Sequence, residues 1–227
     1  RLRILQIVAE DCYEGKVSHV CVLLLDSRSN NHFLPSFSIG LLKTTQWQKR
    51  VVSLMKKSPS VVYWLGNSLY LNITNRCPNN CYFCFRRFKD GIDGFNLKLI
   101  REPSSDEVIK KLQEVINIKN WREVVFCGFG EPLERLDCVL EVTRWIKKYP
   151  GRIVRVDTNG QGYLLNKGRE VVKELKEAGV DKISVGLNAH DKATYNQVCK
   201  PEFENAFENV LKFIETACRE VEVEVTT

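Results

Sequence analysis

The stretch LYLNITNRCPNNCYFC, residues 69–84, joins an apolar segment to three closely spaced cysteines. The segment 69–74 is rich in β-branched and aromatic side chains, which predicts a β-strand. Cys77, Cys81 and Cys84 follow it, and no second pair of similar spacing occurs elsewhere in the chain. Three thiols are too few for a structural zinc site, which takes four protein ligands, and they are an odd number for disulfides.

Four kinds of site compete for these cysteines: structural zinc, a disulfide, a catalytic thiol and an iron–sulfur cluster. A disulfide would leave one thiol over, and a catalytic thiol needs a single cysteine with a basic partner. An iron–sulfur cluster with three thiolate ligands would keep one iron open, which is how a metal site binds a reactant. The number of cysteines therefore favours the cluster.

Composition and charge are those of an ordinary globular protein. The chain has 227 residues, of which 44% are hydrophobic and 27% are charged. The formal charge of +6 is concentrated in residues 1–65, with nine Lys/Arg against four Asp/Glu, whereas the remainder carries 25 against 24. A nucleic-acid partner is therefore not indicated. No apolar run approaches the roughly 18 residues of a membrane span, and we expect no membrane association and a cytoplasmic location.

The other cysteines are scattered through mostly apolar segments. Free cysteines in such surroundings are usually small buried hydrophobes, and we expect reduced thiols in this chain. The six are Cys12, Cys21, Cys127, Cys138, Cys199 and Cys218.

From residue 69 onward, strand and helix patterns alternate. The helix at 104–116 opens with a capping box, Ser104 followed by Glu107. Alternation of this kind predicts an α/β fold with a parallel sheet and right-handed crossovers, although the pattern does not decide between an open sheet and a barrel. The expected strands are 69–74, 123–128, 152–160, 181–188 and 221–226, and the expected helices are 104–116, 136–149, 168–179 and 203–218.

The unusual residues follow the ends of these strands. The cysteine loop comes after the first strand, GFGEP (128–132) after the second, DTNG (157–160) after the third and LNAHD (187–191) after the fourth. The carboxyl ends of parallel strands meet at one edge of a sheet, where α/β proteins bind their ligands. We therefore expect one site at this edge.

The cysteine loop resembles the signature of the radical S-adenosylmethionine (SAM) superfamily, Cys-x3-Cys-x2-Cys with an aromatic residue, here Phe83, before the last cysteine. The resemblance implies a 4Fe-4S cluster held by Cys77, Cys81 and Cys84, with SAM on the open iron. In that family the reduced cluster cleaves SAM to a 5′-deoxyadenosyl radical, which abstracts hydrogen from a substrate. It also implies that Phe83 packs against the adenine, whereas core packing is the alternative for this side chain.

The sequence GFGEP resembles the Gly-Gly-Glu-Pro motif of the same superfamily, with Phe129 in place of the second glycine. By this resemblance Gly128, Gly130, Glu131 and Pro132 hold the methionine amino group of SAM. An ordinary turn between strand and helix is the alternative for such a sequence on its own.

Two further strand ends carry expected cofactor contacts. RVDTNG resembles the third-strand motif of glycyl-radical-enzyme activases and of 7-carboxy-7-deazaguanine synthase, which implies contacts from Asp157, Thr158 and Asn159. Turn chemistry accounts equally well for the Asn-Gly pair. By resemblance Ser184 and Asn188 are candidates for contact with the ribose.

Over residues 64–225 the chain looks most like the TatD-associated radical SAM proteins. That resemblance implies a partial TIM-like (β/α)6 barrel, apparently truncated at the C-terminus after the fifth strand. We expect a radical SAM core at 64–227 and an N-terminal segment of unknown role at 1–63. A native start at Met55 is one interpretation of that segment, and a true extension is the other.

The resemblance implies SAM and an unidentified substrate as ligands, a reductant such as flavodoxin or ferredoxin, and a functional link to a TatD-type hydrolase. Within the class, the alternative function is a glycyl-radical-enzyme activase. From another class, the alternative is a non-catalytic iron–sulfur or zinc-binding protein, which would need a fourth protein ligand. The sequence does not indicate a catalytic residue.

Overall fold

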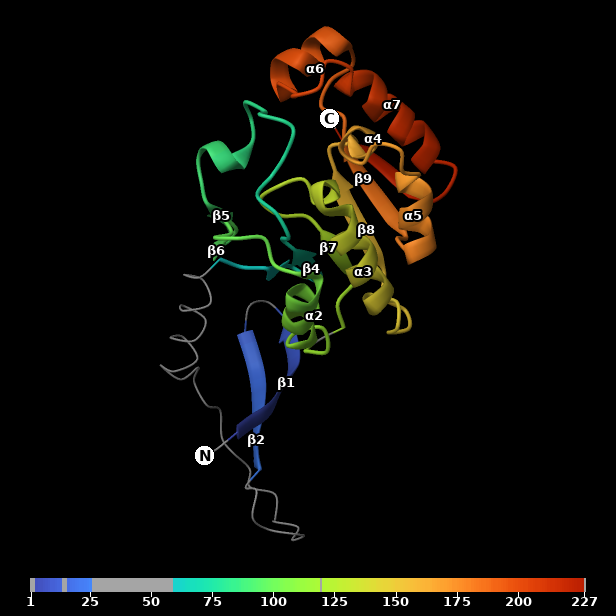
Figure 1. Ribbon diagram of the computed structural model, residues 1–227. Coiled ribbons are helices and arrows are strands. Elements are labelled where there is room, and N and C mark those ends of the chain that lie inside the picture. The colour runs from blue at the N-terminus through green and yellow to red at the C-terminus, as the bar shows by residue number, and fades with distance from the viewer. Residues whose placement is uncertain (1–2, 14–15, 26–58, 119, 227) are drawn as a thin grey trace.

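The computed structural model describes residues 3–13, 16–25, 59–118 and 120–226, and its largest element is a six-stranded sheet (Figure 1). The strand order is β10-β9-β8-β7-β4-β3, parallel throughout except for β3, which pairs antiparallel with β4. The strands are β3 (Val62–Leu65), β4 (Ser68–Leu71), β7 (Glu123–Phe126), β8 (Val154–Thr158), β9 (Lys182–Gly186) and β10 (Glu222–Thr226). All five expected strands are confirmed, and β3 is an addition.

The helices α2, α3, α5 and α7 lie along one face of the sheet, each contacting the next (Figure 1). The strand order from β4 to β10 follows the chain order, so every crossover steps in the same direction and places its helix on the same face. The bounds are α2 (Ser105–Gln113), α3 (Leu136–Ile146), α4 (Gly162–Leu165), α5 (Val171–Ala178), α6 (Lys192–Cys199) and α7 (Ala206–Ala217).

Local sequence signals set the helix ends. The Ser104 side chain accepts from the backbone N–H of Glu107, and the Glu107 side chain accepts from Ser104 N, so the expected capping box is present. Gly179 ends α5 in the left-handed conformation at φ 104°, which costs glycine little. Asp191 caps α6 by accepting from Thr194 N at 2.9 Å, as its sequence position indicates.

The hydrophobic core fills the space between the sheet and these helices. All four side chains of the central strand β7 are buried, as are Leu69 on β4, Val156 on β8 and Ile183 on β9. From the helices, Leu112, Val139 and Phe213 are fully buried. Each such side chain contributes about 1.5–3 kcal/mol through removal of apolar surface from water, so the core fixes the strand ends that carry the candidate site.

The N-terminal segment contains a second, two-stranded sheet. Strands β1 (Arg3–Tyr13) and β2 (Lys16–Leu25) pair antiparallel. Met55 lies outside the described residues. The division of the chain at residues 63 and 64 stays a prediction.

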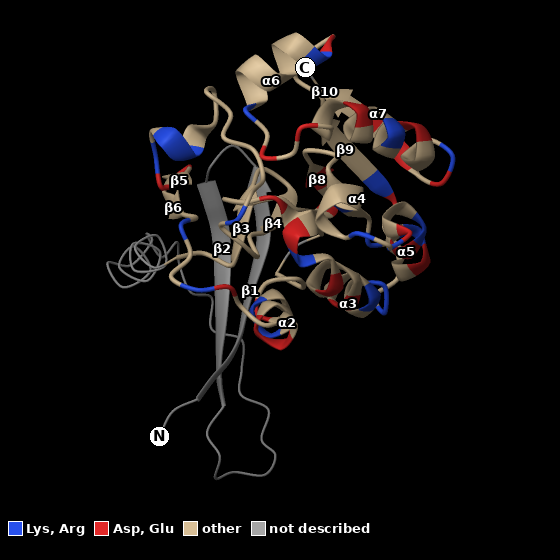
Figure 2. Ribbon diagram, turned by 45° about the horizontal axis from the view of Figure 1, so that its top comes forward, with Lys and Arg blue, Asp and Glu red and all other residues tan. Residues whose placement is uncertain are grey.

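The basic composition of the segment after the cysteines favours a solvated loop. The structure shows more order there. The segment contains the 3-10 helix η1 (Phe85–Arg87) and a short hairpin of β5 (Gly91–Ile92) and β6 (Phe95–Asn96). Phe95 anchors the hairpin by packing against Tyr63 and Trp64. In Figure 2, both charge signs are mixed on the outer helices, and no helix of the described residues is long and apolar enough to span a membrane.

Candidate metal and cofactor site

The cysteine loop lies between the end of β4 and the hairpin, with its three thiols on one short turn. Cys77, Cys81 and Cys84 are free and partly exposed. Among the described residues, no three His, Cys, Asp or Glu side chains converge to hold a single metal ion. In a 4Fe-4S cluster each cysteine binds a different iron. The three sulfurs therefore need to lie on one loop but need not surround a single metal position. Three free cysteines on one loop match the kind of ligand that holds an iron–sulfur cluster.

Each of the three sulfurs has a hydrogen-bonding neighbour. The Arg86 Nε donates to Cys84 Sγ at 3.3 Å, and the Asn159 amide donates to Cys77 Sγ at 3.8 Å. Cys81 hydrogen bonds with the sulfur of Cys199, at the end of α6. The donors to Cys84 and Cys77 stabilise thiolate charge on these two sulfurs, which is what metal ligation requires.

Burial opposes ionisation of these thiols in the metal-free loop. It raises the pKa of Cys77 to about 11, with a smaller contribution from the charge of Glu131, while the nearby Arg86 acts in the opposite direction. The pKa of Cys81 is also raised, first by the hydrogen bond with Cys199 and then by burial. A bound metal centre would supply the positive charge that these buried thiolates need.

The C-terminal end of α6 holds the loop through the backbone. The N–H of Asn80 donates to the Cys199 carbonyl at 3.0 Å, and that of Tyr82 donates to the Val198 carbonyl at 3.1 Å. These bonds flank Cys81 on both sides. Cys199 is buried, as expected, but its contact with a candidate ligand was not predicted.

A buried hydrogen-bond network of two amide side chains and one tyrosine hydroxyl stabilises the cysteine loop. The Gln161 amide donates to Asn79 Oδ1 at 2.6 Å and to the Tyr195 hydroxyl at 3.0 Å, and the Asn79 amide donates to the same hydroxyl at 3.4 Å. All three residues are buried. The network connects the loop to the β8 end and to α6, and none of its members was singled out from the sequence.

The GFGEP turn packs tightly against the start of the cysteine loop. A Cβ on Gly128 would lie 2.3 Å from Asn72 Oδ1, and one on Gly130 would lie 2.3 Å from the Arg76 carbonyl. The Glu131 N–H donates to that same carbonyl at 2.8 Å. Both glycines are therefore required by close backbone approach, whatever they bind.

The Glu131 carboxylate joins two of the motifs. It accepts from the Thr158 hydroxyl at 2.7 Å, from Asn159 N at 2.7 Å and from Leu133 N at 3.0 Å. Burial raises the pKa of Glu131 to about 7, although these three donors lower it. The carboxylate is turned into the protein, and Pro132 beside it is buried in the first turn of η2 (Pro132–Arg135).

Asp157 belongs to a polar group on the open face of β8. Its carboxylate pairs with Arg155 at 2.8 Å, and Arg155 also pairs with Glu123 at 3.2 Å. Burial raises the pKa of Asp157, while Arg155 lowers it. Cys127 hydrogen bonds to Asp157, and burial raises the pKa of that thiol to about 12. This group lines the sheet face opposite the helices.

The remaining predicted residues lie around the same edge. Phe83 is 46% exposed and packs edge-on against Tyr82, so core packing is excluded for it. Ser184 is level with Asp157 in the β8–β9 register. Asn188, in the left-handed region at φ 59°, donates to the Gly186 carbonyl at 3.1 Å and to Cys199 Sγ at 3.8 Å.

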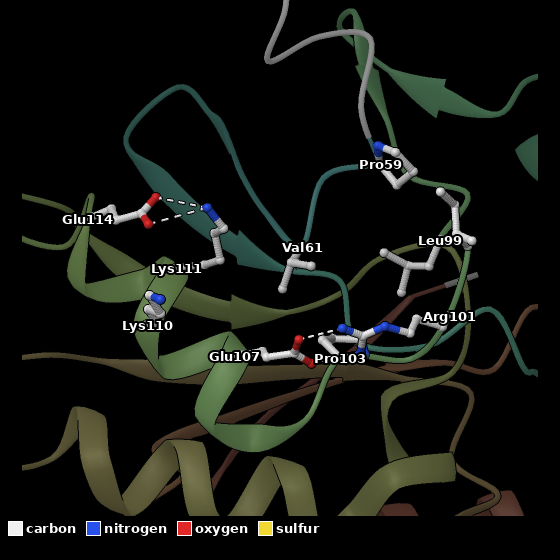
Figure 3. A pocket seen from close by; sticks show the side chains of 10 residues that line it. Pro59, Val61, Leu99, Arg101, Pro103, Glu107, Lys110, Lys111 and Glu114 are labelled. Carbon is white, nitrogen blue, oxygen red and sulfur yellow. Dashed lines mark hydrogen bonds and ion pairs between the residues drawn. The ribbon is translucent and has the colours of Figure 1, made fainter.

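A large pocket lies elsewhere, between α2 and the segments at 59–61 and 99–103 (Figure 3). Its volume is about 580 Å³ and none of the predicted site residues lines it. Its charged side chains pair with one another, Arg101 with Glu107 and Lys111 with Glu114. Lys110 is a further charged side chain in its lining, and no described residue that lines the pocket is a cysteine.

Residues 71–227 match the model of the radical SAM superfamily, and the chain belongs to that superfamily. Members of this superfamily are enzymes that use a 4Fe-4S cluster and SAM.

Curated relatives and solved structures give partial matches. A probable GTP 3′,8-cyclase of Methanococcus aeolicus is 27% identical over 157 residues, covering 69% of this chain and 48% of the relative. The GTP 3′,8-cyclase of Limosilactobacillus fermentum is 31% identical over 147 residues, covering 64% and 41%. The chain thus spans less than half the length of either protein. The crystal structure of methylornithine synthase (PylB) aligns with a TM-score of 0.46 at 15% identity, covering 70% of this chain and 43% of the other.

Proposed function

We propose that Cys77, Cys81 and Cys84 hold the 4Fe-4S cluster and that SAM completes it. The observation that carries the proposal is the position of three free thiols, each beside a hydrogen-bonding group, at the sheet edge where GFGEP and DTNG meet through Glu131. A bound, reduced cluster would supply the electron for reductive cleavage of SAM to methionine and a radical able to abstract hydrogen from a substrate.

The residues of this chain orient the cosubstrate and exclude water. Carbonyl groups of the turn Gly128–Gly130, with Glu131 and Pro132 fixing its shape, would accept hydrogen bonds from the methionine ammonium. The exposed ring of Phe83 offers an apolar face to the adenine.

Polar groups from β8 and β9 would complete the cosubstrate site. Thr158 and Asn159 fix the turn through Glu131 and Cys77. Ser184 and Asn188 would contact the ribose, and Asp157 would add a further polar contact to the cosubstrate. The open sheet face beyond them would then receive the substrate.

The finer family assignment is also a proposal. The stretch at 64–86 supports the TatD-associated subgroup and, with it, a functional link to a TatD-type hydrolase. We further propose a cytoplasmic enzyme whose reductant is a flavodoxin or ferredoxin. The one-directional strand order supports a partial (β/α)6 barrel. The names of the curated relatives make GTP the first substrate to test. The resemblance of RVDTNG to the activase motif makes a glycyl-radical partner protein the second.

One observation favours a non-catalytic site as the second candidate. Cys199 hydrogen bonds with Cys81, so a fourth thiol is within reach of the loop. Four cysteines could close a structural iron–sulfur or zinc site with no place for a cosubstrate.

The test uses the 227-residue chain, purified and reconstituted without oxygen. Electron paramagnetic resonance of the reduced protein is recorded with and without SAM, and 5′-deoxyadenosine is then quantified, with Cys81→Ala as the control. We expect a SAM-dependent spectral change and nucleoside formation that the control abolishes. Stoichiometric zinc, or a cluster indifferent to SAM, would favour the structural site.

A further inference from the structure

The Arg86 side chain connects the cysteine loop to the segment that precedes it. Arg86 lies in η1, two residues after the last cysteine, and is half-buried. Its guanidinium donates to the Asn75 carbonyl at 3.0 Å and to the Asn79 carbonyl at 3.3 Å. One carbonyl precedes the loop and the other lies within it. Because the planar guanidinium fixes the direction of its donors, these bonds hold the two segments at a set separation.

The same guanidinium reaches a candidate ligand. Its Nε donates to Cys84 Sγ at 3.3 Å, which is the one hydrogen bond from a cationic side chain to a cysteine of the loop among the described residues. The donor to Cys77 is the neutral amide of Asn159. A charge-assisted bond contributes about twice as much as a neutral one, so Arg86 is the strongest stabiliser of negative charge at these sulfurs.

The aromatic ring of Phe129 packs against the Arg86 guanidinium. The Arg86 Cζ lies 5.8 Å from the centre of the Phe129 ring, and Phe85 packs edge-on against that ring at 5.8 Å. Phe129 is also the residue that departs from the glycine-rich turn motif. The departure places an aromatic face where it shields Arg86 from water, and shielding strengthens the bond from the cation to the sulfur.

We propose that Arg86 is a positioning residue that holds the cysteine loop in its ligating shape and raises the reduction potential of the cluster. The inference rests on the proposed function of the loop. Reduction adds negative charge, and hydrogen bonds and positive charge at the ligand sulfurs favour the reduced form. The electron needed for SAM cleavage is then accepted at a less negative potential than it would be without Arg86.

Arg87 provides a matched control. It is the adjacent residue in η1, it carries the same charge and it is exposed (Figure 2 shows this basic turn beside β5). Its guanidinium donates to Asn80 Oδ1 at 3.1 Å and makes no hydrogen bond to a described sulfur atom. Its removal changes the net charge equally but not the contacts at Cys84.

The experiment compares Arg86→Gln, Arg86→Lys and Arg87→Gln with the wild-type chain. Cluster potentials are measured by redox titration of the paramagnetic signal without SAM, and iron retention is followed in the presence of a chelator. We expect Arg86→Gln to lower the equilibrium constant for one-electron reduction about tenfold, or about 59 mV, and to lose iron faster. Arg86→Lys should fall between this variant and the wild type, while Arg87→Gln should stay within about twofold of the wild type.

The outcomes separate this inference from the proposed function. A wild-type chain that takes up no cluster would overturn the proposed function. A wild-type cluster that responds to SAM, together with unchanged potential and iron retention in Arg86→Gln and Arg86→Lys, would overturn the role of Arg86 alone. If circular dichroism shows that Arg86→Gln is folded but it takes up no cluster, the loop-holding role is supported. The effect on the reduction potential is then tested with Arg86→Lys.

Discussion

The Thr158 hydroxyl donates a 2.7 Å hydrogen bond to the Glu131 carboxylate, joining the end of β8 to the turn after β7. Asn159 N donates to the other carboxylate oxygen, also at 2.7 Å. Glu131 therefore links the glycine-rich turn to the DTNG turn, and Asn159 continues the link to Cys77. The proposed cosubstrate site and the cysteine loop are thus connected through one buried acid.

Glu131 should make stability depend on pH. Its pKa is raised by burial from 4.5 to about 7, so between these values the folded state binds more protons than the unfolded state. The stabilisation is complete below pH 4.5 and is lost as pH rises through about 7, amounting to as much as about 3 kcal/mol. Urea denaturation of the cluster-free chain between pH 5 and pH 8 should show this slope.

The variant that isolates the effect is Glu131→Gln. Its amide N–H₂ would face the Asn159 N–H, leaving a donor without an acceptor at a cost of about 1–3 kcal/mol. We expect the variant to be less stable and to lose the part of the pH dependence due to Glu131. An unchanged slope in the variant would show that the carboxylate does not titrate in this range.

Gly130→Ala should disturb the turn through steric contact alone. The added Cβ would lie 2.3 Å from the Arg76 carbonyl and 2.7 Å from the Thr74 carbonyl, and both neighbours are backbone atoms that cannot rotate away. We expect a loss of about 1–3 kcal/mol in the free energy of unfolding. The control is Gly186→Ala, whose Cβ would meet only the side-chain amide of Asn188 at 3.2 Å. Equal effects of the two substitutions on urea denaturation would contradict the close approach at Gly130.

Features encoded by neighbouring residues could be predicted from the sequence. The capping box at Ser104, the left-handed Gly179 and the five parallel strands depend on local propensity and periodicity, and all are present. Strand β3 was missed because a four-residue edge strand carries little periodic signal. The placement of GFGEP beside the cysteine loop follows from the rule that parallel strand ends meet at one edge.

The parts of the site that could not be predicted depend on contacts between distant residues. Asn79 and Tyr195 hydrogen bond although they are 116 positions apart. Cys199 was interpreted as a buried hydrophobe, and nothing in its own helix indicates that the helix end lies against Cys81. The role of Phe129 depends on Arg86, which lies in a segment whose basic composition favours a solvated loop. Such contacts follow only from the packed fold.

Tyr195→Phe should loosen the cysteine loop from beneath. The hydroxyl accepts from Gln161 at 3.0 Å and from Asn79 at 3.4 Å, and its removal leaves a buried donor with one acceptor fewer. We expect a loss of about 1–3 kcal/mol in the free energy of unfolding and faster hydrogen exchange at loop amides. Tyr82→Phe, at an exposed position of the loop, is the control and should change neither quantity. Protection equal to wild type in Tyr195→Phe would mean that the network does not stabilise the loop.

Cys199→Ala should keep the cluster, whereas Cys81→Ala should lose it. If three thiolates and SAM complete the cluster, then Cys199 is a hydrogen-bonding neighbour of Cys81 and its removal costs only that contact and some packing. We expect Cys199→Ala to bind wild-type amounts of iron and sulfide and to retain the SAM-dependent spectral change, while Cys81→Ala binds little of either. Cys218→Ala, at an exposed cysteine, controls for the loss of a thiol as such. Loss of the cluster from Cys199→Ala, with binding intact in Cys218→Ala, would instead identify Cys199 as a fourth ligand and favour a closed structural site.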